Sequence, residues 1–361
     1  MTPGQEPIAD RLYAMGAAAM DALTVALGRD LGLYGHLPAS GRSADEFASA
    51  AGIDSRYALE WLEQQASAGI VDVDDPAAVP GERRYSLSAE ATAALTDPDD
   101  PTSIGPLLDG VASMAAVIGI LAAAYRTGDG VAFSRYPDFS RIQGDFNRPV
   151  LLTDFPEWLR GLPVLNERLA SADAPARVLE VGCGEGWGSI GIARAWPHAR
   201  VDGLDIEPES IDAARAHAVA AGVSDRVSFV LADGGAKPVD ACAYDLVFAY
   251  EMVHDLSDPV AVLATMRTAV APGGTVLVFD ERVPEEFTAG ADPVERLMYA
   301  FSVLLCLPTA RVDAPSAATG TVMRPSVLRE YALAAGFSEV ETLDGLGTEL
   351  IRGYRLVTDG V

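Results

Sequence analysis

Hydrophobic and polar positions follow two different patterns along the chain. In residues 11–37 and 55–68, aliphatic side chains recur every three or four residues, which is typical of amphipathic helices. From residue 177 onward, short uninterrupted apolar runs alternate with helical segments, as expected for buried strands of a parallel sheet. The pattern therefore predicts a mainly helical first part and an α/β second part.

The first hundred residues predict three helices followed by a hairpin. We expect Gly28 to end the first helix, because the apolar repeat stops there. The segment Ser-Ala-Asp-Glu at 43–46 is a capping box for the second helix, and Gly52 closes it. After the third helix, two strand-like pieces at 70–73 and 84–87 are joined by a loop that contains Pro and Gly. This order of elements is that of a winged helix-turn-helix.

The stretch 177–205 carries the strongest chemical signal. A β-branched and aliphatic run ends at residue 181 and is followed by Gly182, Gly184 and Gly186. A helical repeat follows these glycines, and a second strand then ends on Asp205. Strand, glycine turn, helix and strand form half of a nucleotide-binding βαβ unit. Glycine lets the chain reverse tightly and lets a ligand approach the backbone.

Two phosphate-binding interpretations are disfavoured. A dinucleotide fingerprint needs a third glycine at 187 or 189, but these positions are Trp187 and Ser189. A nucleotide triphosphatase loop ends in Gly-Lys-Ser/Thr, and no Lys follows these glycines. In addition, Glu180 precedes the turn, and its charge would repel a pyrophosphate but suit a ligand that carries an ammonium group.

The E-V-G-C-G-E-G turn at 180–186, with Asp205 and Asp233 at later strand ends, resembles the cofactor site of class I S-adenosylmethionine-dependent methyltransferases. The resemblance implies that the glycines pass under the methionine part of the cofactor and that Glu180 lies near its ammonium group. It also implies that Asp205 holds the ribose hydroxyls and that Asp233 contacts the adenine amine. An unrelated doubly wound domain with an ordinary tight turn is the alternative. The expected cofactor-binding residues are Glu180, Gly182, Cys183, Gly184, Gly186, Asp205, Ile206, Asp233, Gly234 and Tyr250.

The resemblance extends over nearly the whole chain and implies its organisation. We expect an α/β fold with a Rossmann-like, mostly parallel, seven-stranded sheet whose last strand is antiparallel, preceded by an all-α/winged-helix domain. The expected parts are a winged-helix dimerisation domain at 1–100, a helical connector that covers the active site at 101–172, and an S-adenosylmethionine-binding domain at 173–361. A lid insertion is expected at 283–323.

Charge argues against a nucleic-acid partner. The chain of 361 residues has 26 Lys and Arg against 52 Asp and Glu, a formal net charge of −26, which repels nucleic acid and anionic lipid. The predicted recognition helix carries Glu60 and Glu63 against the single Arg56. We therefore interpret the winged helix as a module for dimerisation and acceptor binding, expect a homodimer, and expect no nucleic-acid or membrane partner.

The setting expected from the sequence is the cytoplasm. The three cysteines, Cys183, Cys242 and Cys306, are widely separated and match neither a disulfide framework nor a metal motif. The first ten residues show no basic segment followed by an apolar core, and the longest uncharged run, 110–125, is short for a membrane span.

The segment after the strand at 244–249 contains the catalytic candidates. Tyr250, Glu251, His254 and Asp255 follow this strand, and ligands of such sheets bind beyond the carboxyl ends of the strands. His-Asp-Leu-Ser-Asp resembles the His-Asp-Trp-Ser-Asp segment of small-molecule O-methyltransferases, in which the histidine takes the proton of the acceptor hydroxyl. An imidazole suits this task because it titrates near neutral pH. We hypothesise that His254 is the general base, with simple packing or helix capping as the alternative.

A second catalytic candidate, Glu281, follows the strand at 275–279. It would orient His254 or hold the acceptor, because a base needs an orienting partner. A solvated strand end is the alternative. Aromatic residues at 133–147 and the Met, Tyr, Phe and Leu residues of the insertion suit an acceptor pocket, although the aromatics also suit interdomain packing. The acceptor-pocket candidates are Tyr136, Phe139, Asn147, Glu251, Met298, Tyr299 and Ser302.

The function implied is transfer of the sulfonium methyl group of S-adenosylmethionine to a small, largely apolar acceptor, leaving S-adenosylhomocysteine. Oxygen is the favoured nucleophile, with nitrogen and carbon left open. No metal is expected, although Asp255, Asp280 and Glu281 at the strand ends keep a metal site open. The alternatives are an enzyme that binds the cofactor but decarboxylates, hydroxylates or cyclises its substrate, a ligand-sensing winged-helix regulator, and a protein or nucleic-acid methyltransferase.

Overall fold

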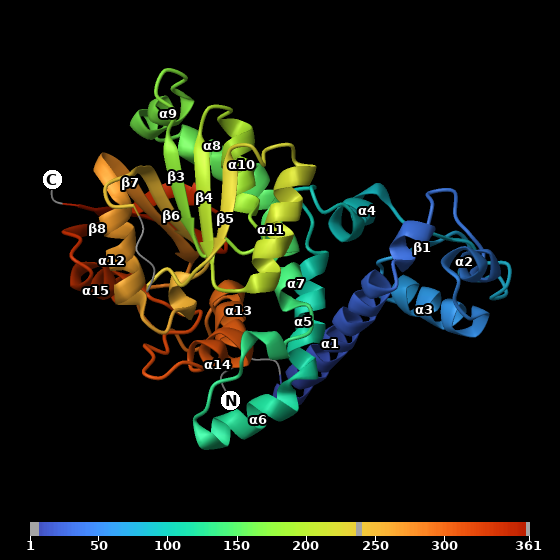
Figure 1. Cartoon of the computed structure of the whole chain (residues 1–361). Coiled ribbons are helices and arrows are strands. Elements are labelled where there is room, and N and C mark those ends of the chain that lie inside the picture. The colour runs from blue at the N-terminus through green and yellow to red at the C-terminus, as the bar shows by residue number, and fades with distance from the viewer. Residues whose placement is uncertain (1–6, 236–239, 359–361) are drawn as a thin grey trace. The chain divides into compact units, whose positions relative to one another are not determined.

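The structure is a computed structural model that describes residues 7–235 and 240–358 (Figure 1). The chain separates into two compact units, residues 1–115 and 116–361. The helices of residues 101–172 are divided between these units, because α5 (Gly105–Ala116) closes the first and the later helices belong to the second.

The first unit consists of helices and a two-stranded antiparallel wing. Ser43 and Glu46 form the predicted capping box at the start of α2, and Gly52 ends this helix in a left-handed conformation. The wing pairs Asp72 with Ser86 and Val73 with Tyr85, so the predicted hairpin is confirmed in a shorter form. The elements before α5 are α1 (Ile8–Asp30), η1 (Leu33–His36), α2 (Ala44–Ala51), α3 (Ser55–Ser67), β1 (Asp72–Val73), β2 (Tyr85–Ser86) and α4 (Ala89–Thr96).

Helix α1 continues through Gly28, so the prediction that this glycine ends the helix is wrong. The helix ends at Asp30, and the chain turns at Gly32, which has φ 65°. A Cβ at Gly28 would lie 2.4 Å from the ring of Trp61 on α3. Gly28 therefore allows close contact between two helices, and the helix ends two residues later.

The second unit is built on a seven-stranded sheet in the order β5-β4-β3-β6-β7-β9-β8 among the described residues. The strands from β5 to β7 are parallel, whereas β9 is antiparallel to both β7 and β8. The predicted Rossmann-like sheet with an antiparallel last strand is thus confirmed. The strands are β3 (Arg177–Val181), β4 (Arg200–Asp205), β5 (Val227–Leu231), β6 (Tyr244–Tyr250), β7 (Val270–Glu281), β8 (Glu339–Gly347) and β9 (Ile351–Val357).

Strand β7 begins earlier than the predicted strand at 275–279. Tyr244 pairs with Val270, but Leu246 already pairs with Thr275, so four residues of β7 bulge out between these pairs. The bulge contains the Pro-Gly-Gly segment at 272–274 that we expected to be a turn before the strand. Beyond it, β7 runs in register with β6 up to the pair of Tyr250 with Phe279.

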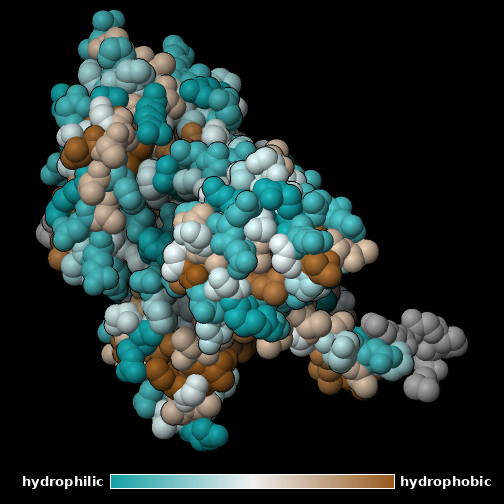
Figure 2. Space-filling model, turned by 90° about the vertical axis from the view of Figure 1, so that its right-hand side faces the viewer, coloured by the Kyte–Doolittle hydropathy of each residue, from teal (hydrophilic) through white to brown (hydrophobic). Residues whose placement is uncertain are grey.

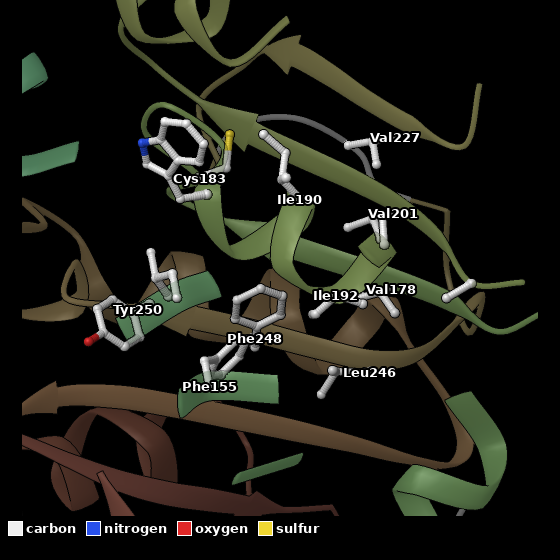
Figure 3. Packing of buried hydrophobic residues seen from close by; sticks show 14 of the residues in the cluster. Phe155, Val178, Cys183, Ile190, Ile192, Val201, Val227, Leu246, Phe248 and Tyr250 are labelled. Atoms are coloured by element: carbon white, nitrogen blue, oxygen red, sulfur yellow. The ribbon is translucent and has the colours of Figure 1, made fainter. Parts of the chain in front are cut away.

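Two hydrophobic cores cover the two faces of the sheet. Helices α7 to α11 cover one face, and α12 and α15 cover the other (Figure 1). The ring centroids of Phe155 and Phe248 lie 5.0 Å apart in the first core, and Tyr250 lies beside them with its hydroxyl turned away (Figure 3). The helices are α6 (Ile118–Thr127), η2 (Phe133–Arg135), α7 (Phe139–Leu152), α8 (Asp154–Arg160), α9 (Pro163–Ala170), α10 (Trp187–Ala195), α11 (Pro208–Ala220), α12 (Pro259–Ala269) and α15 (Pro325–Ala334).

The predicted insertion forms α13 (Pro293–Phe301), the π-helix η4 (Ser302–Cys306) and α14 (Leu307–Ala310). Among the described residues, no helix taken singly has the length and hydropathy of a membrane span. Within the described ranges, one bent pair, α5 and α6 with a bend of 59° between them, meets these two criteria when its helices are taken together.

Candidate active site

The loop after β3 depends on glycine at several positions. Gly182, Gly184 and Gly186 all have positive φ, at 73°, 49° and 82°. A Cβ at Gly186 would lie 2.5 Å from the ring of Phe229, whereas no described atom lies within 4 Å of a Cβ at Gly184. Packing therefore requires glycine at 186, and at 184 the backbone faces open space that a ligand can enter.

Glu180 fixes the start of α10. Its Oε2 accepts hydrogen bonds from the backbone N–H of Ser189, at 2.8 Å, and from the Ser189 hydroxyl. The side chain is buried, and burial raises the pKa of Glu180 to about 8, although both bonds to Ser189 favour the carboxylate. The sequence analysis mentions Ser189 only because a dinucleotide fingerprint would have glycine at this position. The structure shows that Ser189 is the hydrogen-bond partner of Glu180.

Asp205 joins the end of β4 to the glycine loop. Its Oδ2 accepts a hydrogen bond from the backbone N–H of Gly184 at 2.7 Å, and Oδ1 accepts one from Glu207 at 2.9 Å. The next residue, Ile206, is exposed. At the end of the neighbouring β5, Asp233 Oδ1 accepts a bond from the N–H of Gly235 at 2.8 Å.

The remaining predicted cofactor residues are buried against the same strands. Cys183 and Tyr250 belong to the first hydrophobic core, and a Cβ at Gly234 would lie 2.8 Å from Val181. The structure therefore brings the glycine loop together with Glu180 and Asp205.

His254 lies in η3 (Val253–Asp255), directly after β6, and is hydrogen-bonded to Asp280. Its Nδ1 is 2.7 Å from Asp280 Oδ1, and both side chains are almost completely buried. The backbone N–H of Glu281 donates to the same oxygen at 2.9 Å. The residue that hydrogen-bonds the imidazole is thus Asp280 and not Glu281, which corrects the first of the two roles that we expected for Glu281.

Three acidic or thiol groups surround the imidazole. Burial by itself would lower the pKa of His254, but the charges of Asp255 and Asp280 outweigh burial and hold this pKa well above its ordinary value. Nε2 lies 3.4 Å from Asp255 Oδ1. Ligand atoms of His254, Asp255 and Cys306 lie within 4.8 Å of one another, a spacing that could hold a metal ion. Burial raises the pKa of Cys306 to about 12, which favours the neutral thiol, whereas metals bind the thiolate.

Glu251 and Glu281 form a second acidic group at the ends of β6 and β7. Glu251 has φ 48°, an unusual conformation for a residue with a side chain, and its Oε2 accepts a hydrogen bond from Asn147. Burial raises the pKa of Glu251 to about 7 against the opposing effects of Asn147 and His254. Burial and the nearby charge of Glu251 raise the pKa of Glu281 well above its ordinary value.

Two hydrogen bonds join the insertion to the rest of the second unit. The hydroxyl of Tyr136 donates to the carbonyl of Leu304 in η4 at 2.8 Å, and the N–H of Gly320 donates to the carbonyl of His254 at 3.1 Å. Phe139 packs edge-on against Tyr136.

The lid candidates lie on α13 and η4. Met298 and Ser302 are buried, and the hydroxyl of Tyr299 accepts a hydrogen bond from Arg324 at 3.0 Å. The hydroxyl groups of Tyr136 and Tyr299 are therefore bonded within the protein, and their contact with an acceptor remains a prediction.

Sequence reasoning missed Asp280 as the partner of His254, Cys306 beside the imidazole, and Thr321 beside Cys306. Alternation along β7 could have identified Asp280, since Val276 and Val278 face the core that contains Val253. Asp280 lies on the same face of β7 as Val276 and Val278, whereas Glu281 lies on the opposite face. Cys306 and Thr321 come from the insertion, and no local pattern in the sequence connects them to His254.

Comparisons with known proteins assign the family. Residues 178–274 match the model of a methyltransferase domain, and residues 18–97 match that of the Rv2258c-like winged HTH domain. A ubiquinone biosynthesis O-methyltransferase of Aromatoleum aromaticum is 30% identical over 186 residues, which cover 52% of this chain and 74% of that enzyme. The chain belongs to the S-adenosylmethionine-dependent methyltransferases.

Other curated relatives of this methyltransferase are matched over about half their length or less. The ubiquinone biosynthesis O-methyltransferase of Aeromonas salmonicida is 36% identical over 28% of this chain and 42% of that enzyme. The trans-aconitate 2-methyltransferase of Streptomyces avermitilis is 36% identical over 34% of this chain and 44% of that enzyme. The relatives thus differ in substrate and do not fix the acceptor of this methyltransferase.

Solved structures extend the likeness to the whole fold of this methyltransferase. Human N-acetylserotonin methyltransferase, solved in complex with SAM, has a TM-score of 0.72 at 16% identity, with 100% of both chains covered. The mitomycin 7-O-methyltransferase MmcR has a TM-score of 0.70 at 18% identity, with 98% of both chains covered. At these identities the likeness shows the fold alone.

Proposed function

We propose that this methyltransferase transfers the sulfonium methyl group of S-adenosylmethionine to a hydroxyl oxygen of a small organic acceptor, with His254 as the general base. The observation that carries the proposal is the hydrogen bond of 2.7 Å between His254 Nδ1 and Asp280 Oδ1. This bond lies where β6 and β7 end, beside the strand that leads into the glycine loop. Ligands of open parallel sheets bind at this edge.

The cofactor site that we propose uses the loop after β3. Open space at Gly184 would admit the methionine part of the cofactor, and Asp205, already hydrogen-bonded to the Gly184 N–H, would hold the ribose. Exposed Ile206 offers an apolar contact and Asp233 an acceptor for the adenine. Glu180 lies in β3, two residues before the first glycine of the loop. Burial raises its pKa to about 8 in the cofactor-free protein, and a bound ammonium group would favour its carboxylate form.

In the proposed step, an oxygen lone pair of the acceptor forms the new bond to the methyl carbon, and the sulfur–carbon bond breaks with its electrons left on sulfur. The acceptor proton passes to His254 Nε2, which can accept it only when the imidazole is neutral, so methyl transfer should become faster as pH rises toward the raised pKa of His254. Asp280 accepts from Nδ1–H, which orients the imidazole and stabilises the imidazolium that forms. Alignment of acceptor and sulfonium lowers the barrier by up to ~7–11 kcal/mol, and the base adds ~10²–10⁴-fold.

Two measurements test the proposal. Calorimetry should detect binding of S-adenosylhomocysteine, and methyl-labelled S-adenosylmethionine should label members of a panel of phenols and catechols. With an acceptor from the panel that becomes labelled, His254→Gln should lower the single-turnover rate by ~10²–10⁴-fold. The affinity for S-adenosylhomocysteine should stay at the wild-type value. The matched control is His198→Gln, since His198 is exposed. A His254→Gln rate equal to that of the control would contradict the base assignment.

We also propose that the first unit forms the homodimer expected from the sequence. Large apolar side chains of α1 are exposed at helical spacing, among them Ile8, Leu12, Met15, Leu23 and Leu27. Such a stripe on a helix is typical of an interface, and apolar residues are seen at the surface among polar ones (Figure 2).

The dimer proposal is tested by light scattering of purified protein. The double variant Leu12→Asp, Met15→Asp should have half the molar mass of the wild type, because both positions lie on the exposed stripe. Val79→Asp is the matched control, since Val79 is equally exposed but lies in the loop between β1 and β2. A double variant that keeps the wild-type mass refutes the interface.

A further inference from the structure

Four carboxyl groups gather around His254 at the ends of β6 and β7. Glu251 and Asp255 follow β6, and Asp280 and Glu281 end β7. Within the described part of the chain, His254 is the positive group that acts on Glu251, Asp255 and Glu281, while the other groups acting on them through charge are acidic. The protein therefore provides one positive group to four acids.

Two carboxyl oxygens of this group are left without a partner. Asp280 Oδ2 and Glu281 Oε2 are buried and have no hydrogen-bond partner among the described residues, whereas Asp255 Oδ1 lies 3.4 Å from His254 Nε2. Asp280 is 1% exposed and acts through its charge on both glutamates, so its free oxygen belongs to the same cluster. Buried acceptors left unpaired are unfavourable, so their presence together indicates a ligand that donates hydrogen bonds.

We propose that the methyl acceptor carries a positively charged amine beside its nucleophile, and that Glu251 and Glu281 bind this amine while His254 faces the nucleophile. The inference rests on the proposed function. It replaces the largely apolar acceptor expected from the insertion by a cationic one. Asn147 would act as a positioning residue, because it holds the Glu251 carboxylate from α7.

The sulfonium of the cofactor is another cation, but the chemistry of methyl transfer disfavours it as the ligand of these carboxylates. Methyl transfer removes the positive charge from sulfur, so anions placed to stabilise the sulfonium stabilise the reactant more than the transition state and slow the reaction. An amine on the acceptor keeps its charge throughout the reaction. Binding it lowers the energy of reactant and transition state equally.

The experiment measures binding to the full-length enzyme saturated with S-adenosylhomocysteine. Three catechols serve as probes, namely dopamine, 4-methylcatechol and 3,4-dihydroxyphenylacetate, which present a cation, a neutral methyl group and an anion. We expect dopamine to bind about 10- to 100-fold more tightly than 4-methylcatechol, the range of one charge-assisted hydrogen bond, and the anionic probe to bind most weakly. Equal affinity of dopamine and 4-methylcatechol overturns the proposal.

The variants Glu251→Gln and Glu281→Gln test whether these two glutamates cause the preference for dopamine over 4-methylcatechol. Each variant should lose most of the higher affinity for dopamine and keep the wild-type affinity for 4-methylcatechol. An unchanged affinity for S-adenosylhomocysteine would show that the variant is folded. Glu286→Gln is the matched control, because Glu286 is exposed five residues beyond Glu281. A dopamine preference that survives both substitutions overturns the assignment of the two glutamates.

A further arm separates the amine from the sulfonium. If the carboxylates served the sulfonium, Glu281→Gln would weaken S-adenosylmethionine relative to S-adenosylhomocysteine and leave the probe preference intact, which would overturn the proposal. Failure of the proposed function has a different signature. In that case S-adenosylhomocysteine does not bind, or no label leaves S-adenosylmethionine, whatever the probes do.

Discussion

Substitution of Asp280 by Asn should lower the pKa of His254 while the imidazole stays in place. The amide oxygen of Asn can still accept the hydrogen bonds from His254 Nδ1 and from the Glu281 N–H, which in the wild type measure 2.7 and 2.9 Å. The substitution therefore removes a charge and little else. Because Asp280 is one of two anions that hold the His254 pKa well above its ordinary value, its loss must lower that pKa.

The expected fall in the His254 pKa follows from the hydrogen bond between His254 and residue 280, whose acceptor changes from a charged carboxylate to a neutral amide. A bond to a charged partner contributes ~1.5–3 kcal/mol against ~1 kcal/mol for a neutral one, and 1.36 kcal/mol corresponds to one pKa unit. We therefore expect the His254 pKa to fall by about 1 unit. Asp255, with Oδ1 3.4 Å from Nε2, keeps the remaining elevation.

Histidine NMR titration of the S-adenosylhomocysteine complex measures this pKa without an acceptor. The chain has 4 histidines, so His254→Gln identifies the signal of His254 by its disappearance. Asp258→Asn is the matched control, because Asp258 caps α12 through the Ala261 N–H and an Asn caps equally well. A His254 pKa that is the same in wild type and Asp280→Asn would refute the reasoning.

Thermal unfolding gives an independent check on the sign. A histidine whose folded pKa is raised stabilises the protein fully below its unfolded pKa, and this stabilisation is lost as pH rises through the folded pKa. Asp280→Asn should therefore lower Tm most at about pH 6 and least above the raised pKa of His254. A Tm difference that grows with pH would contradict the assignment.

Three further predictions concern the cofactor loop and the thiol. Gly184→Ala should abolish S-adenosylhomocysteine binding with a smaller loss of Tm than Gly186→Ala, because only Gly186 has a close neighbour, the Phe229 ring at 2.5 Å. Glu180→Gln should flatten the fall of Tm in the cofactor-free protein between about pH 5 and 8, since the wild-type Glu180 pKa of about 8 gives stability that is lost as pH rises through it. Dialysis against EDTA should leave methyl transfer unchanged, because the raised pKa of Cys306 favours the thiol, and lost activity would show a metal.

The sequence predicted the cofactor loop well because its determinants are local. Three closely spaced glycines, a β-branched strand before them and an aspartate at the end of the next strand are all visible within thirty residues. The structure adds that all three glycines have positive φ. The mostly parallel, seven-stranded sheet was predicted through resemblance to a family, whereas the winged helix was predicted from the helical repeats and the hairpin of the first hundred residues.

Predictions failed where a distant segment decides the role of a residue. Gly28 looks like a helix stop, and only the position of Trp61 on α3, at 2.4 Å from its virtual Cβ, shows that it is a contact residue. The Pro-Gly-Gly segment at 272–274 looks like a turn, and only pairing with β6 shows that β7 has already begun. Local patterns report backbone preference, whereas these two roles depend on tertiary contacts.

The same reasoning explains why the sequence predicts an apolar acceptor and the folded chain leads us to propose a cationic one. The Met, Tyr and Phe residues of the insertion are contiguous in sequence and dominate its composition, but the structure uses Met298 as a buried side chain and Tyr299 as a partner of Arg324. The acidic groups, in contrast, come from the ends of two strands and meet only in the folded chain. Since an unpaired buried carboxyl oxygen is more unfavourable than a lost apolar contact, our proposal assigns the choice of acceptor to the acidic groups at the strand ends more than to the insertion.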